Sequence, residues 1–194
     1  MPVARPRSAR VRSVRCAACR GAPPPFRRTV AGAAYDGLVR DLVLRLKFGR
    51  DALSARPLAA LVVAALRRAA DAPAARADCV VPLPLSPRRR RERGFNQAEL
   101  IARRVGAALR LPVRPGLLAR VRDAPPQSLA PTRLARREAV RGVFLARVPR
   151  SSRPRRVLLV DDVMTTGATA EAASRALKAA GCAEVIVAVA ARAV

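Results

Sequence analysis

The stretch VLLVDDVMTTGAT, residues 157–169, decides the fold. Its first four residues are aliphatic and predict a strand that is buried on both faces, as in a parallel sheet. Two aspartates follow, then a turn of small and hydroxylated residues, and then TAEAASRALKAA, residues 169–180, which is typical of a helix. Since ligands bind at the carboxyl ends of strands in open α/β sheets, this order predicts a binding site.

The turn after this strand favours phosphate. Backbone N–H groups converge there on a helix N-terminus, which carries the equivalent of roughly half a positive charge. Gly167 lets the backbone approach a ligand closely, and three threonine hydroxyls add donors. The predicted phosphate-binding residues are Thr165, Thr166, Gly167, Ala168 and Thr169.

Asp161 and Asp162 lie a few residues upstream of that turn. Carboxylates accept hydrogen bonds, and a vicinal diol offers two donors. A ligand with a phosphate at one end and a sugar diol beside it therefore satisfies both parts of the stretch. The turn could instead be a simple connection and the aspartates could be helix caps, but the complete string favours a ligand site.

Strands and helices alternate through the rest of the chain. Helices are expected over residues 36–48 and 57–70 and from Asn96 onward, and strands over residues 79–85, 116–121, 142–148 and 184–190. Asn96 and Glu99 have the spacing of a capping box. Residues 86–94, SPRRRRERG, are expected to form a basic loop. This alternation predicts right-handed βαβ units and a parallel sheet.

The predicted fold class is α/β: a Rossmann-like, mainly parallel sheet flanked by helices, with a short N-terminal extension. Residues 1–34 form that extension, a basic Pro/Arg-rich segment with a single CxxC, expected to be poorly ordered. Residues 35–194 form the domain, with a helical part at 36–70 and an α/β core at 79–194. Residues 122–141 are too long for an ordinary connection, so they form either a functional lid or a disordered segment.

Composition excludes several classes of protein. The chain has no histidine, which removes imidazole bases, Ser-His-Asp triads and histidine metal ligands. Its net charge of +26 either attracts polyanions or only solvates the surface. Aromatic residues make up 3%, so any binding to nucleic acid is expected to be weak, nonspecific and salt-dependent. There is neither a signal peptide nor an apolar run long enough for a membrane span, so a cytoplasmic protein is expected.

Three stretches carry a resemblance to known families. VLLVDDVMTTGAT resembles the 5-phosphoribosyl 1-pyrophosphate (PRPP) signature of type I phosphoribosyltransferases. Residues 80–105, VVPLPLSPRRRRERGFNQAELIARRV, and residues 35–49, YDGLVRDLVLRLKFG, resemble the ComF family, whose members are linked to competence for DNA uptake. The similarity spans residues 16–191, nearly the whole chain.

The resemblance implies a fold and a set of roles. It implies a five-stranded, mainly parallel core with a flexible lid, and Mg²⁺ accompanying PRPP. Asp161 and Asp162 would hold the ribose hydroxyls, residues 165–169 the 5′-phosphate, and the loop around residues 86–93 would approach the pyrophosphate. Arg89, Arg91, Arg93 and Lys47 are the candidate pyrophosphate contacts. The alternatives are a solvated basic loop for the arginines and a snorkelling side chain for Lys47.

The cysteines depart from the family pattern. ComF-like chains usually carry two CxxC pairs that form a zinc knuckle, whereas this chain has only Cys16 and Cys19 near its start. A structural zinc needs four ligands, so no zinc is expected in this chain, unless the natural start lies upstream or two chains share a metal. Cys79 and Cys182 are expected in the core.

Two functions remain open at this point. One is a phosphoribosyltransferase that uses Mg²⁺ and PRPP and releases pyrophosphate, with an acceptor that the sequence does not reveal. The other is a non-catalytic accessory protein of DNA uptake that senses PRPP or a nucleotide and acts through competence proteins or single-stranded DNA. The oligomeric state is left open as well.

Overall fold

The computed structural model describes residues 21–69, 77–122 and 142–193. The CxxC pair and residues 123–141 of the expected lid lie outside the described residues. The strands are β1 (Arg28–Ala34), β2 (Cys79–Pro82), β3 (Leu118–Arg120), β4 (Phe144–Ala146), β5 (Arg156–Met164) and β6 (Glu184–Arg192). The α-helices are α2 (Gly37–Phe48), α3 (Ala55–Arg68), α4 (Pro87–Arg93), α5 (Gln97–Leu109) and α7 (Ala168–Ala179), and the 3-10 helices are η1 (Ala52–Ser54), η3 (Pro115–Leu117) and η5 (Arg150–Ser152).

The central sheet is parallel throughout, which confirms the predicted fold class. Its order is β1-β6-β5-β2, and each neighbouring pair runs parallel. The family resemblance implied five strands, whereas the sheet has four. In place of a fifth strand, the segment beside β2 forms a single parallel bridge between Val80 and Val113. β3 and β4 form a separate antiparallel pair.

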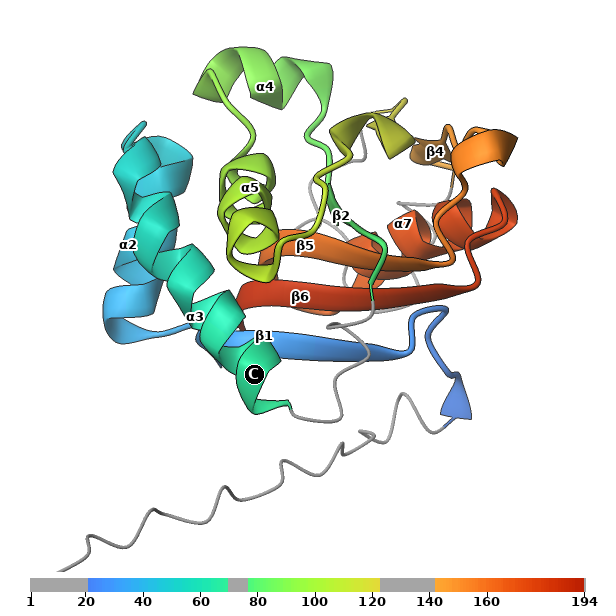
Figure 1. Ribbon diagram of the computed structural model, residues 1–194. Helices are drawn as coiled ribbons and strands as arrows, with labels where there is room; N and C mark the ends of the chain where they lie inside the picture. Colours follow the sequence, from blue (N-terminus) through green and yellow to red (C-terminus); the bar gives the residue numbers. More distant parts are fainter. Residues whose placement is uncertain (1–20, 70–76, 123–141, 194) are drawn as a thin grey trace, which may run out of the picture.

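Helices cover both faces of the sheet (Figure 1), so its two middle strands are apolar along most of their length. Odd-numbered residues of β5 and β6, such as Val157 and Val187, belong to one core cluster together with residues of α7. Even-numbered residues, such as Leu158 and Ile186, belong to the other cluster, with residues of α3 and α5. The last two residues of β5 depart from this pattern, because Val163 packs against the second cluster and Met164 belongs to the first.

The first strand corrects the predicted domain boundary. Residues 28–34 were assigned to the N-terminal extension, but they form β1, an edge strand of the main sheet paired with β6. Their small residues lack the alternation that marks a strand in a sequence. Gly32 shows what holds β1 in place, because a Cβ there would lie 2.7 Å from Ala190 O and 2.9 Å from Leu61 Cβ. Close packing against β6 and α3, which is a tertiary effect, positions this strand.

The expected basic loop at residues 86–94 is a helix, α4. Ser86 caps its start, since the Ser86 hydroxyl accepts a hydrogen bond from Arg89 N at 3.3 Å. Pro87 occupies the first turn, and Gly94 ends the helix with a φ of 80°. Ser and Pro at the start of a helix and a left-handed Gly at its end are residues that favour helix boundaries. The helix therefore forms although its arginines repel one another.

Within these described parts of the chain, no helix is long and apolar enough to cross a membrane.

Candidate functional site

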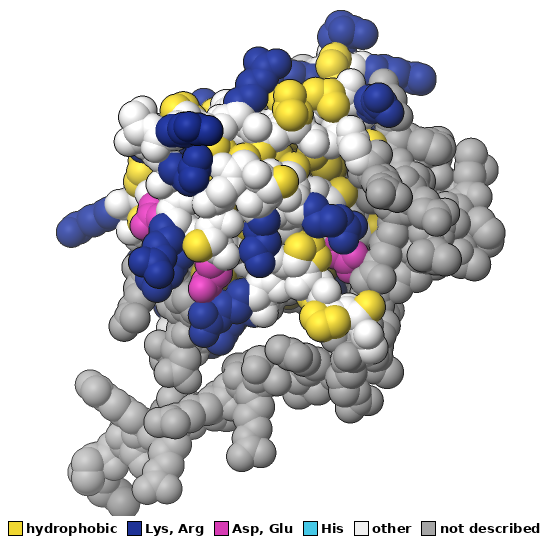
Figure 2. Space-filling view, turned by 90° about the vertical axis from the view of Figure 1, so that its right-hand side faces the viewer, with side chains coloured by type: hydrophobic (Ala, Val, Ile, Leu, Met, Phe, Trp, Pro, Cys, Tyr) yellow, Lys and Arg dark blue, Asp and Glu magenta, His cyan; other side chains and the backbone are white. Residues whose placement is uncertain are grey.

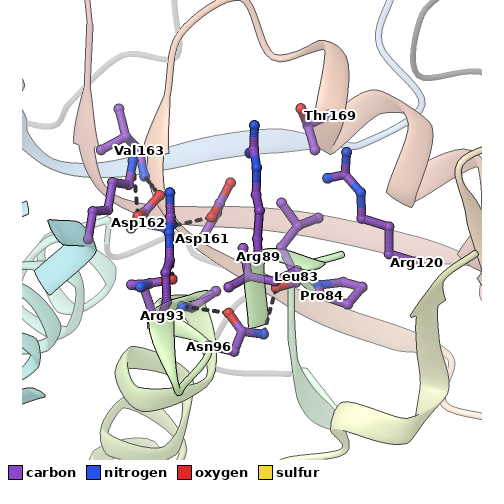
Figure 3. Close-up of a pocket in the computed structure, with 14 residues that line it drawn as sticks. Leu83, Pro84, Arg89, Arg93, Asn96, Arg120, Asp161, Asp162, Val163 and Thr169 are labelled. Carbon is purple, nitrogen blue, oxygen red and sulfur yellow. Dashed lines mark hydrogen bonds and ion pairs between the residues drawn. The ribbon is translucent and has the colours of Figure 1, made fainter. Parts of the chain in front are cut away.

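A crevice opens at the carboxyl edge of the sheet, where β5 continues past the end of β2 (Figure 3). Its volume is about 240 Å³. We call it the aspartate crevice, lined by Lys47, Leu83, Pro84, Leu85, Arg89, Arg93, Asn96, Gln97, Ala98, Arg120, Asp161, Asp162, Val163 and Thr169. The two predicted aspartates, Thr169 and three of the four predicted pyrophosphate contacts thus meet in one cavity.

Both aspartates line the aspartate crevice, but they differ in their further contacts. Asp161 has the parity of the residues that face α7, and it also lines a smaller hollow beside the following turn. Asp162 has the opposite parity, and its Oδ2 lies 3.1 Å from Lys47 Nζ at the end of α2. The strand extends two residues beyond the pair, to Met164, whereas the sequence pattern predicted that it ended before Asp161.

Each aspartate is held by the backbone that follows it. Asp161 Oδ1 accepts a hydrogen bond from Asp162 N at 2.8 Å, and Asp162 Oδ1 accepts one from Val163 N at 2.6 Å. Burial raises the pKa of the Asp161 carboxyl well above its usual range, and the nearby charge of Asp162 adds to this, whereas Lys47 opposes it. A ligand that donates a hydrogen bond to Asp161, or that brings a cation next to it, would therefore stabilise the ionised form of this carboxyl.

The threonine turn, residues 165–169, forms the second part of the site. Gly167 has a φ of 83° and directly precedes the first residue of α7, Ala168. Thr166 Oγ1 accepts from Ala168 N at 3.5 Å. The threonine hollow, about 70 Å³, is lined by Asp161, Val163, Met164, Thr165, Gly167, Ala168, Thr169, Ala170 and Val189. Four of the five predicted phosphate-binding residues line it, while Thr166 has its hydroxyl at the start of the helix.

Only one face of α4 looks into the aspartate crevice. Arg89 and Arg93 are four positions apart and both line it, as the period of a helix requires. Arg91 lies between them in sequence but is exposed and does not line the crevice. The three arginines were predicted as equivalent contacts because this segment was expected to be a loop, in which no helical face distinguishes them.

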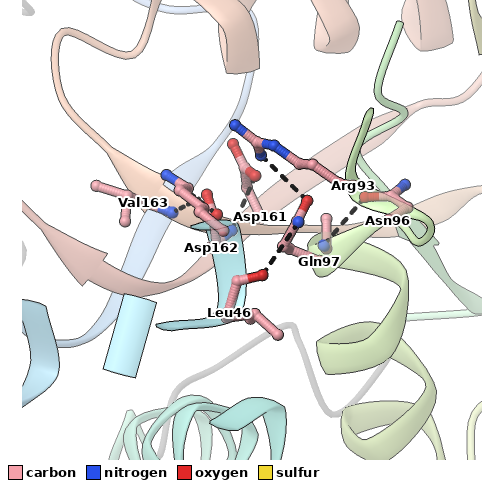
Figure 4. Close-up of polar contacts among 9 residues, drawn as sticks. Leu46, Arg93, Asn96, Gln97, Asp161, Asp162 and Val163 are labelled. Atoms are coloured by element: carbon pink, nitrogen blue, oxygen red, sulfur yellow. Dashed lines mark hydrogen bonds and ion pairs between the residues drawn. The ribbon is translucent and has the colours of Figure 1, made fainter. Parts of the chain in front are cut away.

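A polar network joins α2, α4 and α5 at the floor of the crevice (Figure 4). Gln97, which is almost fully buried, donates to Leu46 O at 3.2 Å and accepts from Arg93 Nη1 at 3.2 Å. Asn96 caps α5 by accepting from Ala98 N at 3.1 Å, and it also donates to Leu83 O at 3.0 Å. The expected start of the helix is confirmed, but Glu99 does not complete a capping box, because its Oε1 accepts from Arg103. Gln97 thus ties Arg93 to the backbone of Leu46, the residue before Lys47, whose side chain pairs with Asp162.

The sequence missed Arg120. This residue ends β3, lines the crevice, and places its guanidinium carbon 5.6 Å from the centroid of the Phe144 ring. The pairing of β3 with β4 brings it there. Nothing in the local pattern GLLARV distinguishes this arginine from the many others in the chain.

The carboxylates of the crevice are too few to hold a metal ion by themselves. In the three described stretches, no group of three or more His, Cys, Asp or Glu side chains could hold a metal ion. Mg²⁺ in nucleotide and phosphate sites is bound through one or two carboxylates together with substrate phosphates and water. Asp161 and Asp162 are the two carboxylates of the crevice that could contribute such ligands.

Comparison with known proteins identifies the family. The phosphoribosyl transferase domain matches residues 92–193. DNA utilization protein YhgH of Escherichia coli (strain K12) is 31% identical over 155 residues, which cover 79% of this chain and 67% of that protein. Competence protein F of Haemophilus influenzae is 31% identical over 172 residues, covering 88% of this chain and 75% of that protein.

This chain belongs to the ComF family, within the type I phosphoribosyltransferase superfamily. YhgH of Salmonella typhi is likewise 33% identical over 160 residues, covering 81% of this chain and 68% of that protein. No solved structure matches the chain. The ComF assignment agrees with the resemblance found in the sequence, and the domain match includes Arg93, both aspartates and the threonine turn.

Proposed function

We propose that the aspartate crevice and the threonine hollow together bind PRPP, and that the protein transfers its phosphoribosyl group with release of pyrophosphate. The observation that carries this proposal is that the two hollows share Asp161, Val163 and Thr169. A sugar with its diol at the aspartates can therefore extend its 5′-phosphate into the threonine turn, where Gly167 and the start of α7 present N–H donors.

The chemistry needs no nucleophilic side chain. As the bond from C1 of the ribose to pyrophosphate breaks, positive charge develops on the ring and negative charge on the leaving group. Arg89, Arg93 and Arg120 line the crevice, and their guanidinium groups would stabilise that negative charge. Bound Mg²⁺ would neutralise further charge on the pyrophosphate, and Asp161 and Asp162 are the residues that would contact the metal–PRPP complex.

Calorimetry tests the binding part of this proposal. We expect PRPP with Mg²⁺ to bind the full chain with one-to-one stoichiometry, and we expect replacement of both aspartates (Asp161→Asn with Asp162→Asn) to abolish binding while circular dichroism stays unchanged. Asp41→Asn makes the same chemical change at an exposed position of α2 and serves as the control. Unchanged PRPP affinity in the double variant would exclude the aspartates from the site.

Pyrophosphate release over a panel of acceptors then tests catalysis. Binding without release would favour the second function, a PRPP-sensing accessory protein of DNA uptake. That alternative is supported by the name of the Haemophilus relative, a competence protein, and by the charge of +26. Figure 2 shows Lys and Arg side chains scattered over one face of the molecule with few acidic ones, which suits contact with a polyanion. Such DNA binding would weaken steeply with salt.

A further inference from the structure

A second cavity lies beside the aspartate crevice. The Phe48 cavity, about 420 Å³, is lined by Lys47, Phe48, Arg50, Arg89, Glu92 and Arg93, from the end of α2, the residues that follow it, and α4. Lys47, Arg89 and Arg93 line both cavities. The two are therefore neighbours that share a wall of cationic side chains, and Phe48, Arg50 and Glu92, which line only the Phe48 cavity, have no role in the binding of PRPP proposed above.

Phe48 differs from every other aromatic residue of the chain. The sequence contains four phenylalanines, one tyrosine and no tryptophan. Phe26, Tyr35, Phe95 and Phe144 are buried or pack against a core cluster, whereas Phe48 is 71% exposed and belongs to neither cluster. The Arg93 guanidinium carbon lies 5.5 Å from the centroid of the Phe48 ring. The most exposed aromatic surface of the protein thus lies in a cavity at the edge of the site, with an arginine over the ring.

The charge of the Phe48 cavity favours an anion. Its lining contains four cationic side chains and one carboxylate, Glu92, which is bound to Arg88 Nε at 2.8 Å. Arg50 donates to the backbone oxygen of Glu92 at 3.4 Å, and among the described residues its charge has no carboxylate partner. Burial lowers the pKa of the Arg93 guanidinium; Asp162 opposes this, and the charge of Arg89 lowers the pKa further. An anion beside Arg50 and Arg93 would relieve the repulsion among these groups.

We propose that the Phe48 cavity binds the acceptor of the transfer, and that this acceptor is a small planar aromatic acid with a nitrogen nucleophile. The aromatic ring stacks on Phe48, and the acid group pairs with Arg50 and Arg93. The role as acceptor rests on the proposed function, whereas the binding of an aromatic acid does not. In the transfer, the nitrogen lone pair forms a bond to C1, pyrophosphate leaves with the electron pair of the broken C1–O bond, and the nitrogen releases its proton to water.

Fluorescence anisotropy of 2-aminobenzoate tests the binding directly, because the protein has no tryptophan to interfere. The uncharged analogue 2-aminobenzamide has the same ring, and we expect it to bind about 10-fold or more weakly, since hydrogen bonds to charged groups are the stronger ones. We expect Phe48→Leu to weaken 2-aminobenzoate binding by roughly 3- to 10-fold and Phe48→Tyr to retain it. Leu38→Ala, which truncates an exposed apolar residue at the other end of α2, should have no effect.

The same variants separate this proposal from the previous one. PRPP affinity, measured by calorimetry, should be unchanged in Phe48→Leu, while kcat/KM for an aromatic acid in pyrophosphate release should fall. Equal binding of the acid and the amide, or equal binding by the wild type and Phe48→Leu, would overturn the proposed site. Displacement of 2-aminobenzoate by a short oligothymidylate at lower concentration than by free aromatic acids would assign the cavity to nucleic acid instead. If 2-aminobenzoate binds as expected but PRPP does not, the role as acceptor falls and the ligand site remains.

Discussion

Lys47 Nζ lies 3.1 Å from Asp162 Oδ2, so an ion pair joins the last turn of α2 to the functional end of β5. Both side chains are largely shielded from water, with 23% and 10% of their surface exposed. The chain has 39 basic residues, and this position at the site holds one of its two lysines. The positive charge of Lys47 also lowers the pKa of Asp161, against the larger effect of burial.

The positive charge of Lys47 should affect the pH dependence of PRPP binding. In the proposed complex the ionised aspartates would accept the ribose hydroxyls, so affinity in the wild type should rise with pH through the raised pKa of Asp161. Lys47→Met removes the charge that lowers this pKa, so the rise should move to higher pH. Lys178→Met, which removes the only other lysine of the chain, should leave the profile in place. Calorimetry across a pH series measures both, and identical profiles for wild type and Lys47→Met would contradict the coupling.

The raised pKa of Asp161 should also make the stability of the ligand-free protein depend on pH. A carboxyl whose pKa is raised by folding binds more protons in the folded state, so stability falls as pH rises from the unfolded pKa through the folded one. Asp161→Asn removes the ionised carboxylate, and we expect a higher Tm than the wild type at neutral pH and a smaller difference in acid. A gain of about 1 kcal/mol would raise Tm by about 2–4 °C in a chain of this size. A lower Tm at neutral pH would contradict the assignment of Asp161 as a desolvated group.

The arginines of α4 offer a matched pair of substitutions. Arg89 and Arg91 are both exposed, but only Arg89 lines the aspartate crevice, since Arg91 lies on another side of the same short helix. We expect Arg89→Gln to weaken PRPP binding by about 10- to 100-fold, the range for hydrogen bonds to charged groups. Arg91→Gln makes the same change in net charge and should alter affinity by less than about 2-fold, since surface charges are screened by salt. Equal losses in the two variants would indicate a general electrostatic effect in place of a direct contact.

Features encoded in a continuous stretch could be predicted from the sequence. The strand, the aspartates and the threonine turn all lie within residues 157–169, and the structure places them at one edge of a parallel sheet. The cap at Asn96 also depends only on its neighbours and was predicted correctly. Local chemistry decides these features, so local patterns were sufficient.

Features that depend on contacts between distant segments could not be predicted. β1 was missed because its position depends on the packing of Gly32 against β6 and α3. The role of Arg120 depends on the pairing of β3 with β4, and the ion pair between Lys47 and Asp162 joins residues from opposite halves of the chain. The helix α4 is a different case, since Ser86, Pro87 and Gly94 were visible signals that the run of arginines obscured.

Gly167 tests whether the threonine turn must keep its present backbone. Its φ of 83° lies in the left-handed region, which costs other residues roughly 1–2 kcal/mol. Gly167→Ala should therefore lower the free energy of unfolding by about that amount, although a Cβ there would meet only Met164 atoms at 3.8 Å or more. It should also weaken PRPP binding, because relaxation of the turn would move its N–H groups away from the phosphate.

Gly116→Ala is the control, since a Cβ would meet nothing within 4 Å and no positive φ is required there. That variant should be neutral or up to about 1 kcal/mol more stable. Urea denaturation and calorimetry measure the two effects, and a Gly167→Ala protein with wild-type stability and affinity would show that the turn adapts freely.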